Sequence, residues 1–123
     1  MILQKLAALT VLAVAAFAAD PTGKWTAEFD TQIGLQKYTY EFKVDGTKLT
    51  GTAKGAAPDG TPFVTEITEG KVNGDDISFV ENFKFQDMEI RIEYSGKVTG
   101  DEIKFTRKVA EYATEELVAK RVK

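Results

Sequence analysis

Apolar and polar residues alternate in short runs from residue 22 to the end of the chain, and glycine-containing or acidic turns separate the runs. An alternation with period two places successive side chains on opposite faces of an extended strand. No segment shows a sustained helical period, although residues 110–116 could form a helical turn in place of a loop. The pattern predicts eight strands, at 23–31, 37–44, 48–54, 63–72, 76–85, 88–98, 102–109 and 116–122.

One short turn pattern occurs three times, as KVDGTKL at 43–49, KVNGDDI at 71–77 and KVTGDEI at 97–103. Each copy is typical of a β-hairpin turn, because glycine allows positive φ and its Asp, Asn and Thr neighbours favour turns. Two strands and two turns lie between successive copies, so the three turns must lie at the same end of a sheet. The four other connections share no pattern, and they form the opposite, variable end, which we call the mouth.

The same alternation assigns one face of every strand to the interior. The opposite face is rich in Lys, Thr and Glu, as contact with water requires. Gly70 interrupts the alternation between Ile67 and Val72, which predicts a β-bulge. The large side chains with the inward phase are Trp25, Phe29, Tyr38, Tyr40, Phe42, Val44, Phe63, Ile77, Phe79, Phe83, Phe85, Ile90, Ile92, Tyr94, Val98, Ile103 and Phe105.

Eight strands with one apolar face could form a sandwich or a closed barrel. Hairpins that follow one another in sequence favour the barrel, and closure also removes exposed strand edges. The predicted fold class is therefore all-β, as an eight-stranded antiparallel up-and-down β-barrel in which the first strand pairs with the last.

The first residues of the chain have the composition of a secretory signal peptide. Lys5 is followed by an apolar run at 6–17 and by small residues ending at Ala18. The run is short for a membrane span, which disfavours the alternative of an uncleaved anchor. We therefore expect a cleaved signal peptide at 1–18, one domain at 19–123, no stable membrane insertion, and a secreted or periplasmic location.

The composition excludes several classes of function. The chain has no Cys, so it carries neither a disulfide nor the acylated cysteine of a lipoprotein, and it has no His, which excludes most zinc sites and every His-dependent triad. The net charge of -3 leaves no basic excess for nucleic acid. Neighbouring acidic residues in the turns come at most in pairs, too few for calcium. We expect no metal, no cofactor and no enzymatic activity.

Two charged residues have the inward phase, Glu81 and Arg107. On the register that the turns suggest, they lie two strand spacings apart across Tyr94, roughly 9 to 10 Å. They could form an internal ion pair with Tyr94 as a third partner, since buried charges are paired. Alternatively, Arg107 could bind the carboxylate of a small amphiphile with help from Tyr94 or Tyr112. A wrong phase assignment is the third reading, and Tyr40 is a further interior candidate.

A second acidic feature is the pair Glu115 and Glu116. Two acidic residues can serve as the acid and base of a glycosidase, but neighbours on a strand point to opposite faces. We interpret this pair as a solvated charge run.

The ends of the predicted barrel carry a resemblance to a known group of proteins. Gly23 and Trp25 open the first strand and Arg121 closes the last, which resembles the signature of the calycins, namely lipocalins, fatty-acid-binding proteins and avidins. The resemblance implies that Trp25 packs at the closed end beneath the Arg121 side chain. The segments TGKWT at 22–26 and TGT at 50–52 are especially similar to avidin.

The chain departs from these families where their ligands bind. Avidin needs several Trp residues around biotin and this chain has one, so biotin binding is not carried over. Fatty-acid-binding proteins have a helical lid, for which only residues 32–36 are available here, although their inward Arg and Tyr groups are the precedent for a carboxylate at Arg107. The whole exported part also looks like a group of small exported bacterial proteins without an established activity.

These observations give three functional hypotheses. The first is a secreted, non-enzymatic barrel that binds a small hydrophobic or amphipathic ligand, carboxylates included, weakly or not at all. Its interior would be mostly packed, with at most a shallow pocket at the mouth. The second is an interaction or structural module of the cell envelope that binds protein or glycan through its surface. The third is an enzyme that uses Glu81 as a base. The pattern leaves the oligomeric state open.

Overall fold

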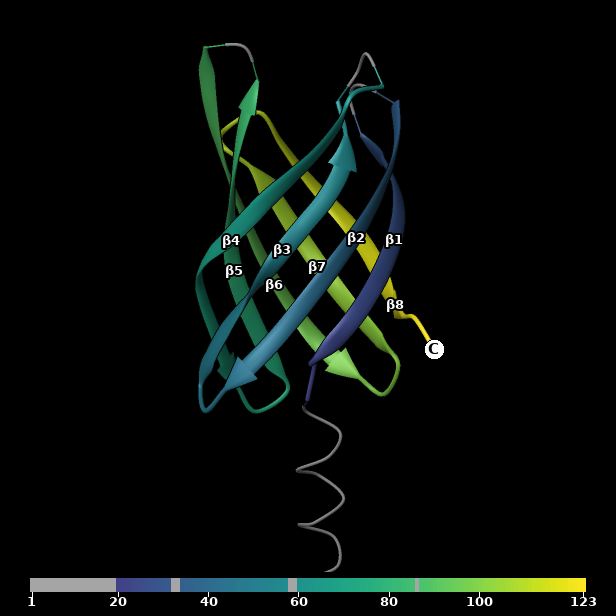
Figure 1. The fold of residues 1–123 in the computed structure, drawn as a ribbon, viewed down its shortest axis with the longest axis vertical. Helices are drawn as coiled ribbons and strands as arrows, with labels where there is room; N and C mark the ends of the chain where they lie inside the picture. The colour runs from purple at the N-terminus through teal and green to yellow at the C-terminus, as the bar shows by residue number, and fades with distance from the viewer. Residues whose placement is uncertain (1–19, 32–33, 58–59, 86) are drawn as a thin grey trace, which may run out of the picture.

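The computed structural model describes residues 20–31, 34–57, 60–85 and 87–123. They form a closed barrel of eight antiparallel strands, each paired with its neighbours in the chain (Figure 1). The predicted signal peptide at 1–18 lies outside the described residues, as does the side chain of Phe85. The strands are β1 (Gly23–Thr31), β2 (Gly34–Asp45), β3 (Lys48–Ala56), β4 (Pro62–Asn73), β5 (Asp76–Phe85), β6 (Met88–Thr99), β7 (Glu102–Val109) and β8 (Ala113–Arg121).

The fold class and the strand order predicted from the sequence are confirmed, and the largest differences are the starts of β2 and β8, each three residues earlier than predicted. The sequence predicted a strand from residue 116, whereas β8 begins at Ala113. Residues 110–112 form a tight turn, with Ala110 at φ 47° and a hydrogen bond of 2.9 Å from the Tyr112 amide to the Val109 carbonyl. The helical turn considered for this segment is therefore wrong, because residues 113–116 continue the ladder with β7.

The three repeated turns lie together at the lower end of the barrel in Figure 1, as predicted. They connect β2 to β3, β4 to β5 and β6 to β7. Their glycines Gly46, Gly74 and Gly100 have φ values of 65°, 61° and 61°, a conformation that side chains rarely adopt. The four variable connections lie at the opposite end, the mouth.

The predicted bulge is present in β4. The register with β5 shifts between Thr68 and Lys71, and Glu69 has a φ of 53°. A Cβ atom on Gly70 would lie 2.0 Å from the Leu49 carbonyl oxygen of β3, so only glycine allows the two strands to approach here.

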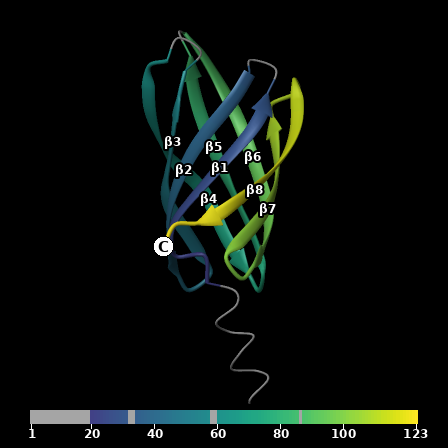
Figure 2. The same ribbon diagram turned by 90° about the vertical axis from the view of Figure 1, so that its right-hand side faces the viewer.

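The first and last strands close the barrel only near the lower end. Their ladder runs over the pairs Trp25–Arg121 and Thr26–Lys120, and the Val122 amide donates to the Lys24 carbonyl at 2.8 Å. Beyond these pairs β1 and β8 diverge toward the mouth (Figure 2), and an outer groove of about 1130 Å³ lies along the seam. The predicted pairing of the first strand with the last is therefore confirmed, and part of each of these two strand edges stays outside the ladder.

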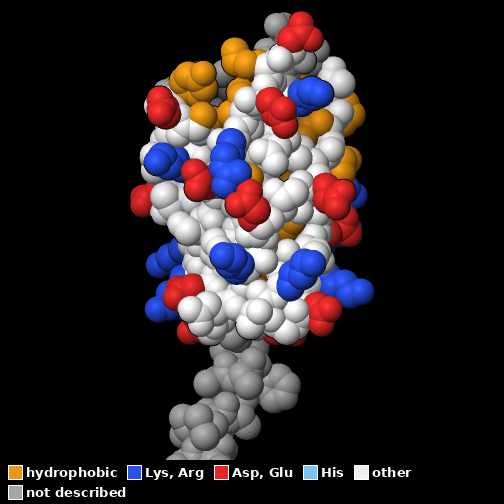
Figure 3. All heavy atoms as spheres, turned by 90° about the vertical axis from the view of Figure 1, so that its left-hand side faces the viewer, with side chains coloured by type: hydrophobic (Ala, Val, Ile, Leu, Met, Phe, Trp, Pro, Cys, Tyr) orange, Lys and Arg blue, Asp and Glu red, His pale blue; other side chains and the backbone are white. Residues whose placement is uncertain are grey.

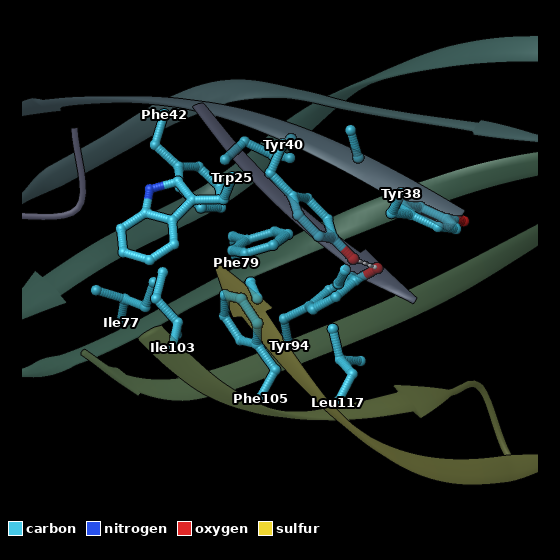
Figure 4. Close-up of a cluster of buried hydrophobic side chains, with 14 of the residues drawn as sticks. Trp25, Tyr38, Tyr40, Phe42, Ile77, Phe79, Tyr94, Ile103, Phe105 and Leu117 are labelled. Atoms are coloured by element: carbon cyan, nitrogen blue, oxygen red, sulfur yellow. Dashed lines mark hydrogen bonds between the residues drawn. The ribbon is translucent and has the colours of Figure 1, made fainter. Parts of the chain in front are cut away.

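The interior is apolar and the exterior charged, as the alternation requires. Lys, Arg, Asp and Glu side chains are interspersed over the outer face, while apolar side chains gather toward the mouth (Figure 3). Aromatic rings fill the middle of the barrel (Figure 4), with Phe79 and Tyr94 stacked at a centroid distance of 4.3 Å. Among the described residues only two charged side chains are buried, Glu81 and Arg107.

Candidate functional site

The centre of the candidate site is the carboxylate of Glu81, which comes from β5 and is completely buried. The Tyr94 hydroxyl of β6 donates to its Oε1 at 2.9 Å, and the Tyr38 hydroxyl of β2 donates to its Oε2 at 3.1 Å. Both oxygens are therefore hydrogen-bonded, which is what a buried carboxylate requires.

Arg107 of β7 is the cation of this network. Its Nε donates to the Tyr94 hydroxyl at 2.8 Å and its Nη2 donates to the Tyr38 hydroxyl at 3.1 Å. Nη2 also lies 3.9 Å from Glu81 Oε1, so the predicted internal ion pair is present, with the two tyrosines between its charges.

A second carboxylate binds Arg107 from the side of the mouth. Arg107 Nη1 donates to Glu115 Oε1 at 2.5 Å, and the Glu115 side chain is 11% exposed. Because β8 starts at Ala113, Glu115 lies directly opposite Arg107 in the ladder and shares its inward phase. The interpretation of Glu115 as part of a solvated charge run is therefore wrong, whereas Glu116 is exposed as expected.

Aromatic rings surround the guanidinium. Its Cζ lies 5.2 Å from the ring centroids of both Phe29 and Tyr38, and 5.6 Å from that of Tyr94. Cation–π attraction thus adds to the ion pairs and helps to keep this charge inside the barrel.

The hydrogen bonds fix the direction of donation in the tyrosine chain. The Tyr94 hydroxyl has one proton, which goes to Glu81, so the Tyr40 hydroxyl at 2.9 Å must donate to Tyr94. Figure 4 shows the Tyr40 and Tyr94 hydroxyls pointing toward one another across the interior.

Burial shifts the pKa values of these groups. It raises the pKa of the Glu81 carboxyl above its ordinary value, while the charge of Arg107 and the hydrogen bonds from Tyr94 and Tyr38 oppose the rise. Burial also raises the pKa of Tyr38, Tyr40 and Tyr94 well above the ordinary tyrosine value. The tyrosines therefore remain protonated donors, and Arg107 remains charged.

A cavity of about 220 Å³ lies between this network and the mouth. Its polar wall includes Arg107, Glu115 and Tyr38. Its apolar wall consists of Ala56, Phe63, Phe83, Ile90, Ile92, Val109 and Ala113. The pocket expected at the mouth therefore extends down to the charged residues in the middle of the barrel.

Four of the five predicted ligand-binding candidates lie in the interior: Glu81, Tyr94, Arg107 and Tyr40. Among them only Arg107 lines the cavity, while the other three lie behind it in the core. The interior placement of Tyr112 is wrong, because it belongs to the turn between β7 and β8. Tyr112 is 64% exposed and lines the cavity from the rim.

Sequence reasoning missed two members of the site, Tyr38 and Glu115. Tyr38 carried the inward phase, but its contact with Arg107 joins β2 to β7 across the barrel, which strand register alone does not show. Glu115 could have been found from a shorter turn, since a turn at 110–112 places it opposite Arg107.

The signature residues Gly23, Trp25 and Arg121 lie together at the closed end. The Arg121 Cζ is 4.4 Å from the Trp25 ring centroid, the arrangement that the calycin resemblance implied. Arg121 Nη1 and Nη2 donate to the carbonyls of Thr22 and Asp20 at 3.0 and 3.1 Å. These contacts hold the segment that precedes β1 across the barrel end, so we assign this cluster a structural role.

Within the described part of the chain, no group of three or more His, Cys, Asp or Glu side chains is placed to hold a metal ion. The same residues contain no helix that is long and apolar enough to cross a membrane. Compared with known proteins, the chain matches no protein-family model, no curated protein and no solved structure.

Proposed function

We propose that this protein is an exported, non-enzymatic barrel that binds one small hydrophobic or amphipathic molecule in the mouth cavity. The observation that carries the proposal is a cavity with apolar walls that reaches Arg107. Binding sites for small molecules are mostly apolar, with a few placed polar groups that orient the ligand. This cavity has that composition, because its lining combines seven apolar side chains with the charged groups of Arg107 and Glu115 and with four uncharged polar residues, namely Thr31, Gln36, Tyr38 and Tyr112.

The cavity volume limits the size of the ligand. About 220 Å³ is less than the roughly 300 to 1,000 Å³ that drug-sized ligands occupy, whereas a dry cavity of about 150 Å³ is enough for benzene. The proposal therefore concerns a ring of benzene size or a chain of about eight carbons, and not a long-chain lipid. A site of this size and open rim is expected to bind weakly.

Two further observations support binding without catalysis. Glu81, the base that an enzyme would use, is fully buried and does not line the cavity. Both of its oxygens accept hydrogen bonds from tyrosines, so each is already engaged within the core. The calycin-like contact of Trp25 with Arg121 supports a family of barrels that carry ligands, and we include that relationship in the proposal.

The first test is native mass spectrometry of the protein purified from its own host, with extraction and identification of any bound molecule. Titration with 1-octanol by calorimetry then measures binding directly. Ala113→Phe, which places a ring in the cavity, should abolish octanol binding. Thr114→Phe, which adds the same ring on the exposed face of β8, should leave it unchanged.

The proposal fails if neither 1-octanol nor a charged probe of the same chain length binds, or if both ring substitutions have the same effect. A mass without any passenger, together with no binding of any of these probes, would mean that the cavity does not hold ligands.

A second candidate function, an interaction module of the cell envelope, is favoured by the seam between β1 and β8. Beyond Thr26 and Lys120 the two edges do not pair, and unpaired edges can accept an extended strand from another chain. Hydrogen exchange of the β1 and β8 amides tests this function. Added envelope protein should slow their exchange if a partner strand binds there, and unchanged exchange would exclude that mode.

A further inference from the structure

The charged groups beside the cavity have no net positive charge that would attract an anionic ligand. One guanidinium, Arg107, lies beside two carboxylates, with Nη1 at 2.5 Å from Glu115 and Nη2 at 3.9 Å from Glu81. If Glu81 is ionised, the cluster carries one net negative charge. If burial keeps Glu81 protonated, Glu115 alone balances Arg107. Neither state leaves a net positive charge for a ligand carboxylate.

Three of the five N–H donors of Arg107 are also engaged within the protein. Each of its three nitrogens already donates to a protein group: Nε to Tyr94, Nη1 to Glu115 and Nη2 to Tyr38. A ligand carboxylate would have to displace Glu115 or add a like charge beside it in a poorly hydrated site, which is unfavourable.

We propose that the cavity selects an amphiphile whose polar end donates hydrogen bonds, and that Glu115 accepts the hydrogen bond from it. A primary amine should bind more tightly than an alcohol. The inference deepens the proposed function and rests on it. The resemblance to fatty-acid-binding proteins suggested a ligand with a carboxylate, which accepts hydrogen bonds. The inference replaces it with a ligand whose polar end donates them.

Glu115 is the acceptor because of its position. It lines the cavity and is nearly buried, whereas Glu81 does not line the cavity. Its Oε1 accepts from Arg107, so the guanidinium holds the side chain in place and leaves Oε2 for the ligand. An ammonium group bound there would restore a balance of two cations and two carboxylates when Glu81 is ionised.

Three probes of equal chain length test the inference at neutral pH: octylamine, 1-octanol and octanoate. The amine is then cationic and the acid anionic. Calorimetric titration of the wild-type protein should give binding in the order amine, alcohol, carboxylate, with about a tenfold or larger difference in Kd between the first and the last.

Substitution of Glu115 identifies the acceptor. In Glu115→Gln the preference for octylamine over octanol should disappear, and octanoate should bind more tightly than it does to the wild type. Glu116→Gln makes the same charge change at the neighbouring residue, whose side chain is exposed on the outside of the barrel. In this variant the three probes should bind in the same order of affinity as to the wild type. Thermal unfolding of both variants establishes that they are folded at the titration temperature.

The outcomes separate this inference from the proposed function. Tightest binding of octanoate, or equal binding of the three probes, would overturn the inference while the proposed function stands. The same applies if Glu115→Gln and Glu116→Gln behave alike. Binding of none of the probes would overturn the proposed function and the inference together.

Discussion

The two ends of the barrel are built from the same strands but differ in packing. At the closed end Trp25, Ile77 and Ile103 are at most 2% exposed. At the mouth Phe83 and Ile90 are only partly buried and face about 220 Å³ of empty space. The difference teaches that the same eight strands can be tightly packed at one end of a barrel and leave a cavity at the other.

The boundary between the two regions is the polar network. Below it the rings of Tyr40, Phe79, Tyr94 and Phe105 pack against one another, with centroid distances between 4.3 and 6.2 Å. The hydroxyls of Tyr40 and Tyr94 point away from this apolar layer, toward one another and the charged groups above it. The tyrosines thus present carbon to the core and oxygen to the site.

Truncation at the closed end should have the largest effect. Trp25→Ala removes a fully buried ring and its contact with Arg121, so unfolding in urea should show a loss of about 3 to 5 kcal/mol. Phe83→Ala, at the mouth, should cost less than about 2 kcal/mol, because its ring is only partly buried and already borders a cavity. Equal losses for the two variants would contradict the division of the barrel into a packed and a hollow end.

Removal of the cation from the boundary should have the next largest effect. Arg107→Met leaves Glu81 buried without its ion pair, and urea unfolding should show a loss of about 3 kcal/mol. The double variant Arg107→Met with Glu81→Gln should be more stable than the sum of the single losses predicts, because neither charge is then left unpaired. Additive losses would mean that the two groups do not depend on one another.

The pH dependence of Glu81 should be the smallest effect. Its pKa is raised by burial, so between the ordinary value of 4.5 and the raised folded value the folded protein holds more protons than the unfolded chain. The difference in unfolding free energy between the wild type and Glu81→Gln should therefore have its full value below pH 4.5. It should fall as the pH rises through this window. Urea unfolding of both proteins across the window measures it. A difference that stays constant, or increases with pH, would show that the folded pKa is not raised.

Much of the fold could be predicted because alternation and turn chemistry are local properties of the sequence. The short turn between β5 and β6 predicts Phe79 opposite Tyr94, and the repeated turn between β6 and β7 predicts Tyr94 opposite Arg107. Both pairings are confirmed. The bulge at Gly70 was visible because it breaks the alternation of apolar positions.

The site was only partly predictable because its missing members depend on other information. The length of the turn at 110–112 decides whether Glu115 faces Arg107 or water. Because Glu115 and Glu116 are adjacent and identical, the sequence does not indicate which of them points into the barrel. The contact of Tyr38 with Glu81 crosses the barrel between strands that are not neighbours. The short ladder between β1 and β8 depends on how the barrel closes, which no local pattern encodes.

Methyl NMR of isoleucine-labelled protein tests the central claim most directly, because isoleucines occupy both regions. Titration with octylamine should shift the methyl signals of Ile90 and Ile92, which line the cavity, and leave those of Ile77 and Ile103 unchanged. Shifts at Ile77 and Ile103 would show that the closed end is not packed. The absence of shifts at Ile90 and Ile92, with octanol as well as octylamine, would show that the mouth cavity does not bind ligands.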